Sequence, residues 1–60
     1  MSNIMGEKIH KARIKNKLRQ NELAIMLGVS EKTVGRWERG EFIPSLINQR
    51  RIEKMLKINI

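Results

Sequence analysis

The segment Gln20–Gly40, with the sequence QNELAIMLGVSEKTVGRWERG, contains two helical patterns separated by the three residues Gly28, Val29 and Ser30. Within Gln20–Leu27 the apolar residues recur at helical spacing, and Gly28 follows as the residue type that ends a helix in a left-handed conformation. Ser30 then offers an N-cap for a second helix, Glu31–Arg39, which the last glycine of the segment terminates. The pattern predicts two short helices joined by a tight turn.

Small and apolar residues inside this segment have the spacing that close packing of two helices requires. Ala24 lies four residues after Gln20 and lets the helices approach, because a larger side chain would push them apart. The residues expected to face inward are Leu23, Leu27, Val29, Val34 and Trp37. The residues left for the outer surface of the second helix are Lys32, Thr33, Gly35, Arg36 and Arg39. This arrangement is the helix-turn-helix geometry.

A further helix is predicted before this segment, over about Ile4–Asn16. Ser2 or Asn3 is available as its N-cap. Its apolar positions at one-turn spacing are Met5, Ile9 and Ala12. The single histidine, His10, lies among basic residues and is expected to face solvent or a phosphate.

A fourth helix is predicted after the connection that ends at Pro44. It begins after Ser45 as N-cap and runs to about Leu56 or Lys57. Its expected inward stripe is Leu46, Ile52, Met55 and Leu56. The fold class is therefore all-α: a compact bundle of four short helices in one domain over residues 1–60, with the helix-turn-helix motif at about residues 20–39.

Composition restricts the function to a few classes. The chain has 60 residues, a formal net charge of +7 and no cysteine, so it supports one thin core and no disulfide framework. The basic balance favours a polyanionic partner. With one histidine and no cysteine, aspartate or tyrosine, no catalytic set, metal site or cofactor site can be assembled, and neither an enzyme nor a small-molecule substrate is expected. No apolar run spans a membrane, so a cytoplasmic protein is expected.

The quoted segment resembles the DNA-binding domain of the Cro and phage-repressor type, also called the XRE family. The pattern LA…LGVS…V..WE.G carries the likeness, which extends upstream through MGEKIHKARIKNKL and downstream to IPSL. The resemblance implies a transcriptional regulator, expected to be a repressor, that binds double-stranded DNA sequence-specifically. Its third helix would enter the major groove of a pseudo-palindromic operator, and a homodimer is the default. Such a protein would act in a bacterial or phage-infected cell, associated with the nucleoid.

The resemblance assigns base contacts to the start of the third helix. The matching residues are Glu31, Lys32, Gly35 and Arg36, with Thr33 close by. Lys32 and Arg36 can donate to guanine, Glu31 can accept from cytosine, and Gly35 leaves room for a thymine methyl. Glu31 also has a purely structural role open to it, since an acidic residue in the first turn stabilises a helix.

The resemblance also implies phosphate contacts and one ion pair. Gln20 and Arg39 match positions that contact the DNA backbone, and Arg19 stands where relatives carry Ser or Thr as N-cap. Arg19 therefore removes a cap and adds a charge directed at DNA. Arg13 and Glu38 match a pair that links the first helix to the recognition helix.

The last helix departs from the family pattern. Gln49 and Glu53 stand where relatives often have Leu and Ala, and Lys57 replaces a usual glycine. Its basic residues are Arg50, Arg51, Lys54 and Lys57, which form either a solvated face or a second DNA site. The candidates for a small apolar dimer contact are Ile47, Ile58 and Ile60.

Three other functions remain open. The chain could be the DNA-binding module of a longer regulator, or an antitoxin whose main partner is a protein. A cationic membrane-surface peptide needs one continuous helix, which Gly28, Gly40 and Pro44 interrupt. Nonspecific nucleoid or RNA binding would follow charge alone, but Trp37 and Phe42 supply few aromatic platforms for single strands.

Overall fold

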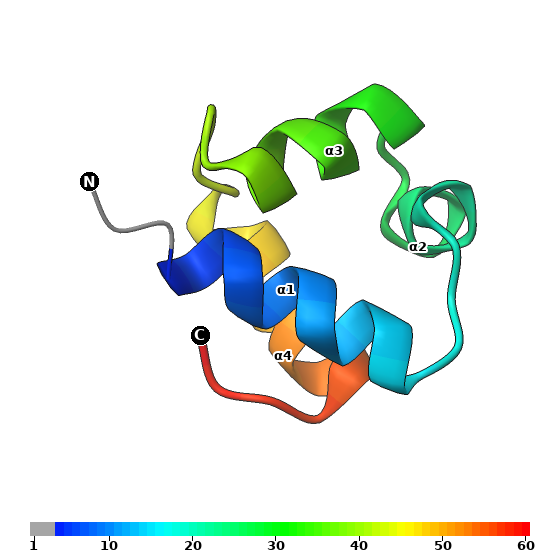
Figure 1. The fold of residues 1–60 in the computed structure, drawn as a ribbon. Coiled ribbons are helices and arrows are strands. Elements are labelled where there is room, and N and C mark those ends of the chain that lie inside the picture. Colours follow the sequence, from blue (N-terminus) through cyan, green and yellow to red (C-terminus); the bar gives the residue numbers. More distant parts are fainter. Residues whose placement is uncertain (1–3) are drawn as a thin grey trace.

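The computed structural model describes residues 4–60, which form four helices and no strand (Figure 1). The helices are α1 (Ile4–Lys15), α2 (Gln20–Leu27), α3 (Glu31–Arg39) and α4 (Leu46–Leu56). The all-α prediction is confirmed, and the helix boundaries agree with the predicted ones to within one residue. The predicted caps Ser2 and Asn3 lie outside the described residues.

The turn between α2 and α3 is built by local hydrogen bonds. Gly28 adopts the left-handed conformation, with φ 73° and ψ 30°. The Val29 amide donates to the Ala24 carbonyl at 3.0 Å, which closes the end of α2. Ser30 then caps α3, because its Oγ accepts from the Thr33 amide at 3.1 Å.

The start of α2 lacks a side-chain acceptor at its N-cap, as predicted from Arg19. A guanidinium carries only donors, so it cannot cap the amides of the first turn. Glu22 instead accepts from the Arg19 backbone amide at 2.8 Å, which supplies one half of a capping box. The local gain in stability is therefore smaller than in a helix that begins with Ser or Thr.

The core lies where all four helices meet. Its fully buried side chains are Ile9, Leu23, Leu27, Val34 and Ile52. Ala12, Ala24, Trp37 and Leu56 complete it. Helix α3 packs against both α1 and α2, so the core fixes its orientation relative to the rest of the domain. The inward placement of Trp37 is as predicted, and that of Val29 is only partial.

The prediction that Leu46 faces the core is wrong. Leu46 is 62% exposed, whereas Ile52 and Leu56 are buried. Six residues separate Leu46 from Ile52, which is not a whole number of helical turns, so Leu46 lies away from the buried stripe. Pro44 is buried just before α4.

The end of the chain folds back onto the domain. Lys57 ends α4 in the left-handed conformation, with φ 57°, where the family usually has glycine. The Ile58 amide donates to the Glu53 carbonyl, and the Ile60 amide donates to the Glu53 carboxylate at 3.0 Å. Ile58 and Ile60 consequently pack against the core rather than projecting from it.

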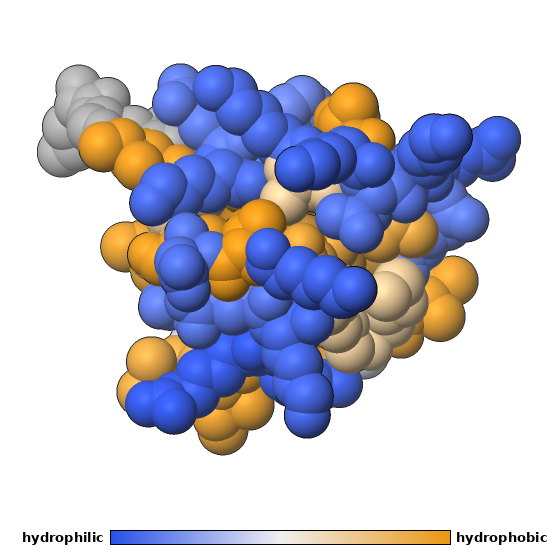
Figure 2. Space-filling model, turned by 90° about the horizontal axis from the view of Figure 1, so that it is seen from below, coloured by the Kyte–Doolittle hydropathy of each residue, from blue (hydrophilic) through white to orange (hydrophobic). Residues whose placement is uncertain are grey.

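Hydrophilic side chains cover most of the face in Figure 2, which lies opposite α3, and apolar residues form separate areas between them. Among residues 4–60, no helix has the length and apolar character that a membrane span requires. The same part of the chain contains no cluster of three or more His, Asp or Glu that could hold a metal ion.

Candidate nucleic-acid interface

Helix α3 is strongly two-sided. Val34 and Trp37 are buried on its inner side, while Lys32 and Arg39 are exposed on its outer side. Arg36, one turn after Lys32, is partly exposed. The outer side of α3 therefore presents three cationic side chains from a rigidly packed helix.

A surface pocket of about 540 Å³ lies where the start of α3 meets α2. It is lined by Gln20, Ser30, Glu31, Lys32, Gly35 and Arg39. The pocket thus brings together five of the eight residues that the resemblance assigned to bases or phosphates. Its lining combines the amide of Gln20 and two cations with the Glu31 carboxylate, so it offers both donors and acceptors to polar base edges.

The other three assigned residues lie outside this pocket. Thr33 is partly buried, and its Oγ1 lies 2.8 Å from the Oγ of Ser30. Arg19 is exposed at the start of α2. Arg36 extends toward the chain after α3, where its guanidinium carbon lies 5.3 Å from the centre of the Phe42 ring.

Gly35 is buried, so the expectation that it belongs to the outer surface is wrong. A Cβ at this position would lie 3.1 Å from Nη1 of Arg39 and 3.7 Å from the amide of Gln20. Those two side chains cover the glycine from α3 and α2. The missing side chain therefore admits Arg39 and Gln20 rather than exposing bare backbone to a partner.

Arg39 is held by an ion pair with Glu41. Its Nε donates to the Glu41 carboxylate at 2.5 Å, and both side chains are exposed. The hydrogen bond from Arg39 lowers the pKa of Glu41 below its ordinary value. Because water screens this pair, an incoming anion can compete with Glu41 for the guanidinium.

Glu38 on α3 accepts hydrogen bonds from several side chains beside the pocket at the start of α3. The Arg13 Nε donates to Oε2 at 2.6 Å and its Nη2 donates to Oε1 at 3.1 Å. A third donor of Arg13, Nη1, bonds the Leu18 carbonyl at 2.8 Å. The two ionic side chains are only 8% and 6% exposed, so α1 and α3 are joined by a nearly buried ion pair.

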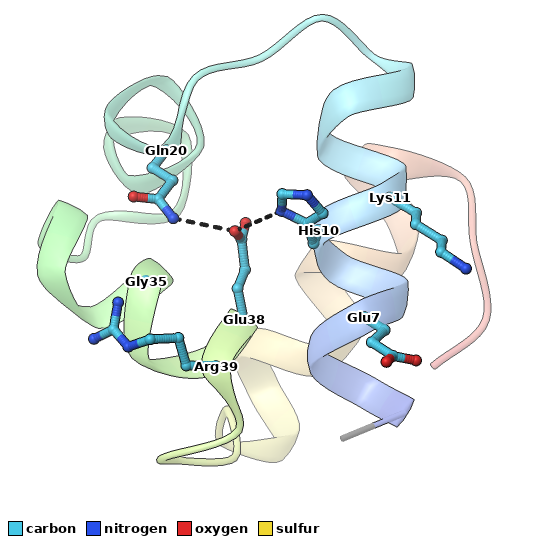
Figure 3. Close-up of a pocket in the computed structure, with 7 residues that line it drawn as sticks. All are labelled: Glu7, His10, Lys11, Gln20, Gly35, Glu38 and Arg39. Atoms are coloured by element: carbon cyan, nitrogen blue, oxygen red, sulfur yellow. Dashed lines mark hydrogen bonds and ion pairs between the residues drawn. The ribbon is translucent and has the colours of Figure 1, made fainter. Parts of the chain in front are cut away.

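Gln20 and His10 also point toward Glu38 (Figure 3). The Gln20 Nε2 donates to Oε1 at 3.1 Å, and Nδ1 of His10 lies 3.0 Å from the same oxygen. Burial opposes ionisation of Glu38, but the hydrogen bonds from Arg13, His10 and Gln20 outweigh it. The pKa of Glu38 is consequently lowered from its ordinary value.

The role of His10 differs from the sequence expectation. Its imidazole is about half exposed but contacts Glu38 instead of facing only solvent or a phosphate. A second pocket of about 420 Å³ lies beside this contact, lined by Glu7, His10, Lys11, Gln20, Gly35, Glu38 and Arg39. The three-residue spacing of His10 and Arg13 on one helix face was the available signal.

These features define a helix-turn-helix domain, and comparison with known proteins agrees. A model of the helix-turn-helix family matches residues 9–60, and the chain belongs to that family. It is 41% identical over 54 residues to repressor protein C2 of Salmonella phage P22. That match covers 90% of this chain but 25% of the relative, so the chain spans about a quarter of the length of that relative.

A solved structure is also similar. It is the crystal structure of the P22 c2 repressor protein in complex with synthetic operator 9T in the presence of Tl⁺. The TM-score is 0.85 at 40% identity, over 92% of this chain and 83% of that one. The four-helix arrangement of Figure 1 is therefore shared with a repressor domain bound to an operator.

Proposed function

We propose that this protein binds double-stranded DNA sequence-specifically as a transcriptional repressor, with α3 in the major groove. The observation that carries the proposal is the pocket at the start of α3, where Gln20, Lys32 and Arg39 converge. Its position agrees with the docking of repressor helices, whose N-terminal residues contact base edges. The similarity to an operator-bound phage repressor supports the same function.

The assigned residues divide into two roles. Glu31, Lys32 and Arg36 extend from α3 and are proposed to read base edges, with Thr33 beside them and Gly35 giving room to the side chains of Arg39 and Gln20. Gln20, Arg19 and Arg39 flank them and are proposed to contact phosphates, which fix the position of the domain on the duplex. The protein would then act in the cytoplasm of a bacterial or phage-infected cell.

Two copies are proposed to pair on a pseudo-palindromic site. The exposed apolar residues Ile43, Leu46 and Ile47 lie within five consecutive residues around the start of α4, and we propose them as the pairing surface. Ile58 and Ile60, which the sequence suggested for this contact, are packed against the core. Because a stable interface buries roughly 800 Å² per partner, three side chains support only weak pairing that DNA must reinforce.

The test is selection of binding sites from randomised duplex DNA at one fixed salt concentration. Lys32→Ala is compared with Lys54→Ala, which removes the same charge from an exposed position on α4. We expect the wild type and Lys54→Ala to select one motif with two-fold symmetry. Lys32→Ala should lose preference at particular bases. Equal binding to all sequences, with no motif for any variant, would refute the proposal.

A second candidate is the same DNA-binding role within a longer regulator. The specific observation in its favour is the P22 relative, of which the matched region is about a quarter. The two candidates differ in the pairing of this chain by itself. A domain that pairs only through another region of a longer regulator would select a single half-site in the same experiment.

A further inference from the structure

We infer that Phe42 is a positioning residue that holds the guanidinium of Arg36 ready to read a base. The inference rests on the proposed function and assigns a role to a residue that lies outside the motif. Its basis is the position of Arg36 over the Phe42 ring, with 5.3 Å between the guanidinium carbon and the ring centre. This distance is within the range of a cation–π contact.

The backbone after α3 creates this contact. Gly40 takes the left-handed conformation with φ 78°, so the chain reverses over the last turn of the helix. The Glu41 amide donates to the Arg36 carbonyl at 2.9 Å, and the Phe42 amide approaches the same oxygen at 3.5 Å. The ring is thus anchored through the main chain to the residue whose side chain it supports.

The ring of Phe42 serves neither the core nor a buried contact. Phe42 is 55% exposed and does not belong to the buried cluster. Single exposed apolar residues are common on folded proteins, so the contact with Arg36, and not exposure alone, assigns a role to Phe42. Here the ring contacts Arg36, the arginine of α3 that does not line the pocket at the start of α3.

A cation–π contact does not use the N–H donors of a guanidinium. A guanidinium contacts an aromatic ring through its flat face, while its N–H donors point outward in the plane. Two of these in-plane donors match O6 and N7 of a guanine. The ring therefore restricts the many rotamers of the arginine without occupying the donors that would contact a base.

The experiment is a double-mutant cycle on one duplex half-site, which removes any effect of pairing between copies. The variants are Phe42→Ala, Arg36→Ala and the double variant, with Phe42→Tyr as conservative rescue. Ile25→Ala is the matched control, since it removes an exposed apolar side chain on α2 that belongs to neither the proposed DNA contacts nor the proposed pairing surface. Site selection is run in parallel, and thermal melting checks that each variant is folded.

We expect Phe42→Ala to weaken binding by about 3- to 5-fold and to relax the same base position that Arg36→Ala relaxes. In the Arg36→Ala background the second substitution should change affinity less than 2-fold, on the order of measurement scatter. Phe42→Tyr should restore both affinity and preference, and Ile25→Ala should change neither.

Two results overturn the inference. One is an equal loss for Phe42→Ala with and without Arg36, which places the ring in some other contact. The other is an unchanged base preference for Phe42→Ala beside a relaxed one for Arg36→Ala. A wild type that selects no motif would instead overturn the proposed function, so the two failures are distinguishable.

Discussion

Arg13 and Glu38 make a two-point contact across the interface of α1 and α3, at 2.6 Å and 3.1 Å. Both side chains are almost fully shielded from water. Such a pair fixes geometry more than it stabilises, because desolvation of two charges cancels much of their attraction. Removing only one partner should be strongly destabilising, because the other then remains buried without its main counter-charge.

We expect Arg13→Met to cost about 3 kcal/mol of unfolding free energy, which is most of what a domain of this size has. The double variant Arg13→Met with Glu38→Leu should be more stable than Arg13→Met alone. Urea unfolding followed by circular dichroism measures both. A double variant less stable than either single variant would show that the pair itself supplies the stability.

Acid should destabilise the protein through Glu38. Its folded-state pKa is below the ordinary value of 4.5, so its contribution is complete above that pH. That contribution is lost as the pH falls through the lowered pKa. Melting temperature measured from pH 7 to pH 2 should therefore fall below about pH 4.5 in the wild type. Glu38→Gln should show a shallower decline over the same range, and an identical decline would exclude Glu38 as the cause.

Replacement by alanine should change the stability of the protein in opposite directions at two glycines. Gly35 has helical backbone, so Gly35→Ala should stabilise α3 by about 0.5–1 kcal/mol, provided that the flexible end of Arg39 moves away. Gly28 has open space but φ 73°, so Gly28→Ala should destabilise by about 1–2 kcal/mol. Thermal unfolding distinguishes them. The displaced Arg39 should also weaken DNA binding by Gly35→Ala, despite its greater stability.

Glu41 should act as a competitor of DNA for Arg39. Glu41→Gln releases the guanidinium and is expected to raise DNA affinity a few-fold at low salt, by roughly one added phosphate contact. Fluorescence anisotropy over a salt series would show a steeper salt dependence. Glu7→Gln makes the same change in net charge at another exposed position. Equal effects of the two variants would mean that net charge alone is responsible.

Pairing on DNA should depend on Ile47, which is 71% exposed on the first turn of α4. Ile47→Lys is expected to leave folding and half-site affinity unchanged but to abolish cooperative binding to a two-fold site. Gel electrophoresis with full and half sites measures this. Ile25→Lys places a charge at an equally exposed apolar position on α2 and should retain cooperativity. Loss of cooperativity in both variants would argue against a specific pairing surface.

Local signals explain why the helices were predictable. Ser30, Gly28 and Gly40 fix helix ends through hydrogen bonds that span five residues or fewer, and such effects are visible in a short window of sequence. Leu46 shows the limit of this approach. Its apolar character suggested burial, but its angular position on α4 leaves it outside the core.

The parts of the site that match the family pattern were predictable from the sequence. The parts that depend on tertiary contacts were not. The Arg13–Glu38 contact lies where the resemblance implies, although 25 residues separate its partners. The burial of Gly35 depends on how Gln20 and Arg39 cover it, and the approach of His10 to Glu38 depends on the packing of α1 against α3. Phe42 had a local signal, because the reversal after a C-terminal glycine returns the next residues to the preceding turn.

The carboxylate of Glu38 receives side chains from α1 and from α2 while it belongs to α3. A tilt of α2 or α3, the two helices of the motif, would therefore disturb the contacts of Glu38 with α1 as well. In the proposed function, the spacing between the phosphate and base contacts would therefore be set when the domain folds. A duplex that deviates from that spacing must itself deform, so the flexibility of the DNA would enter the affinity for each sequence.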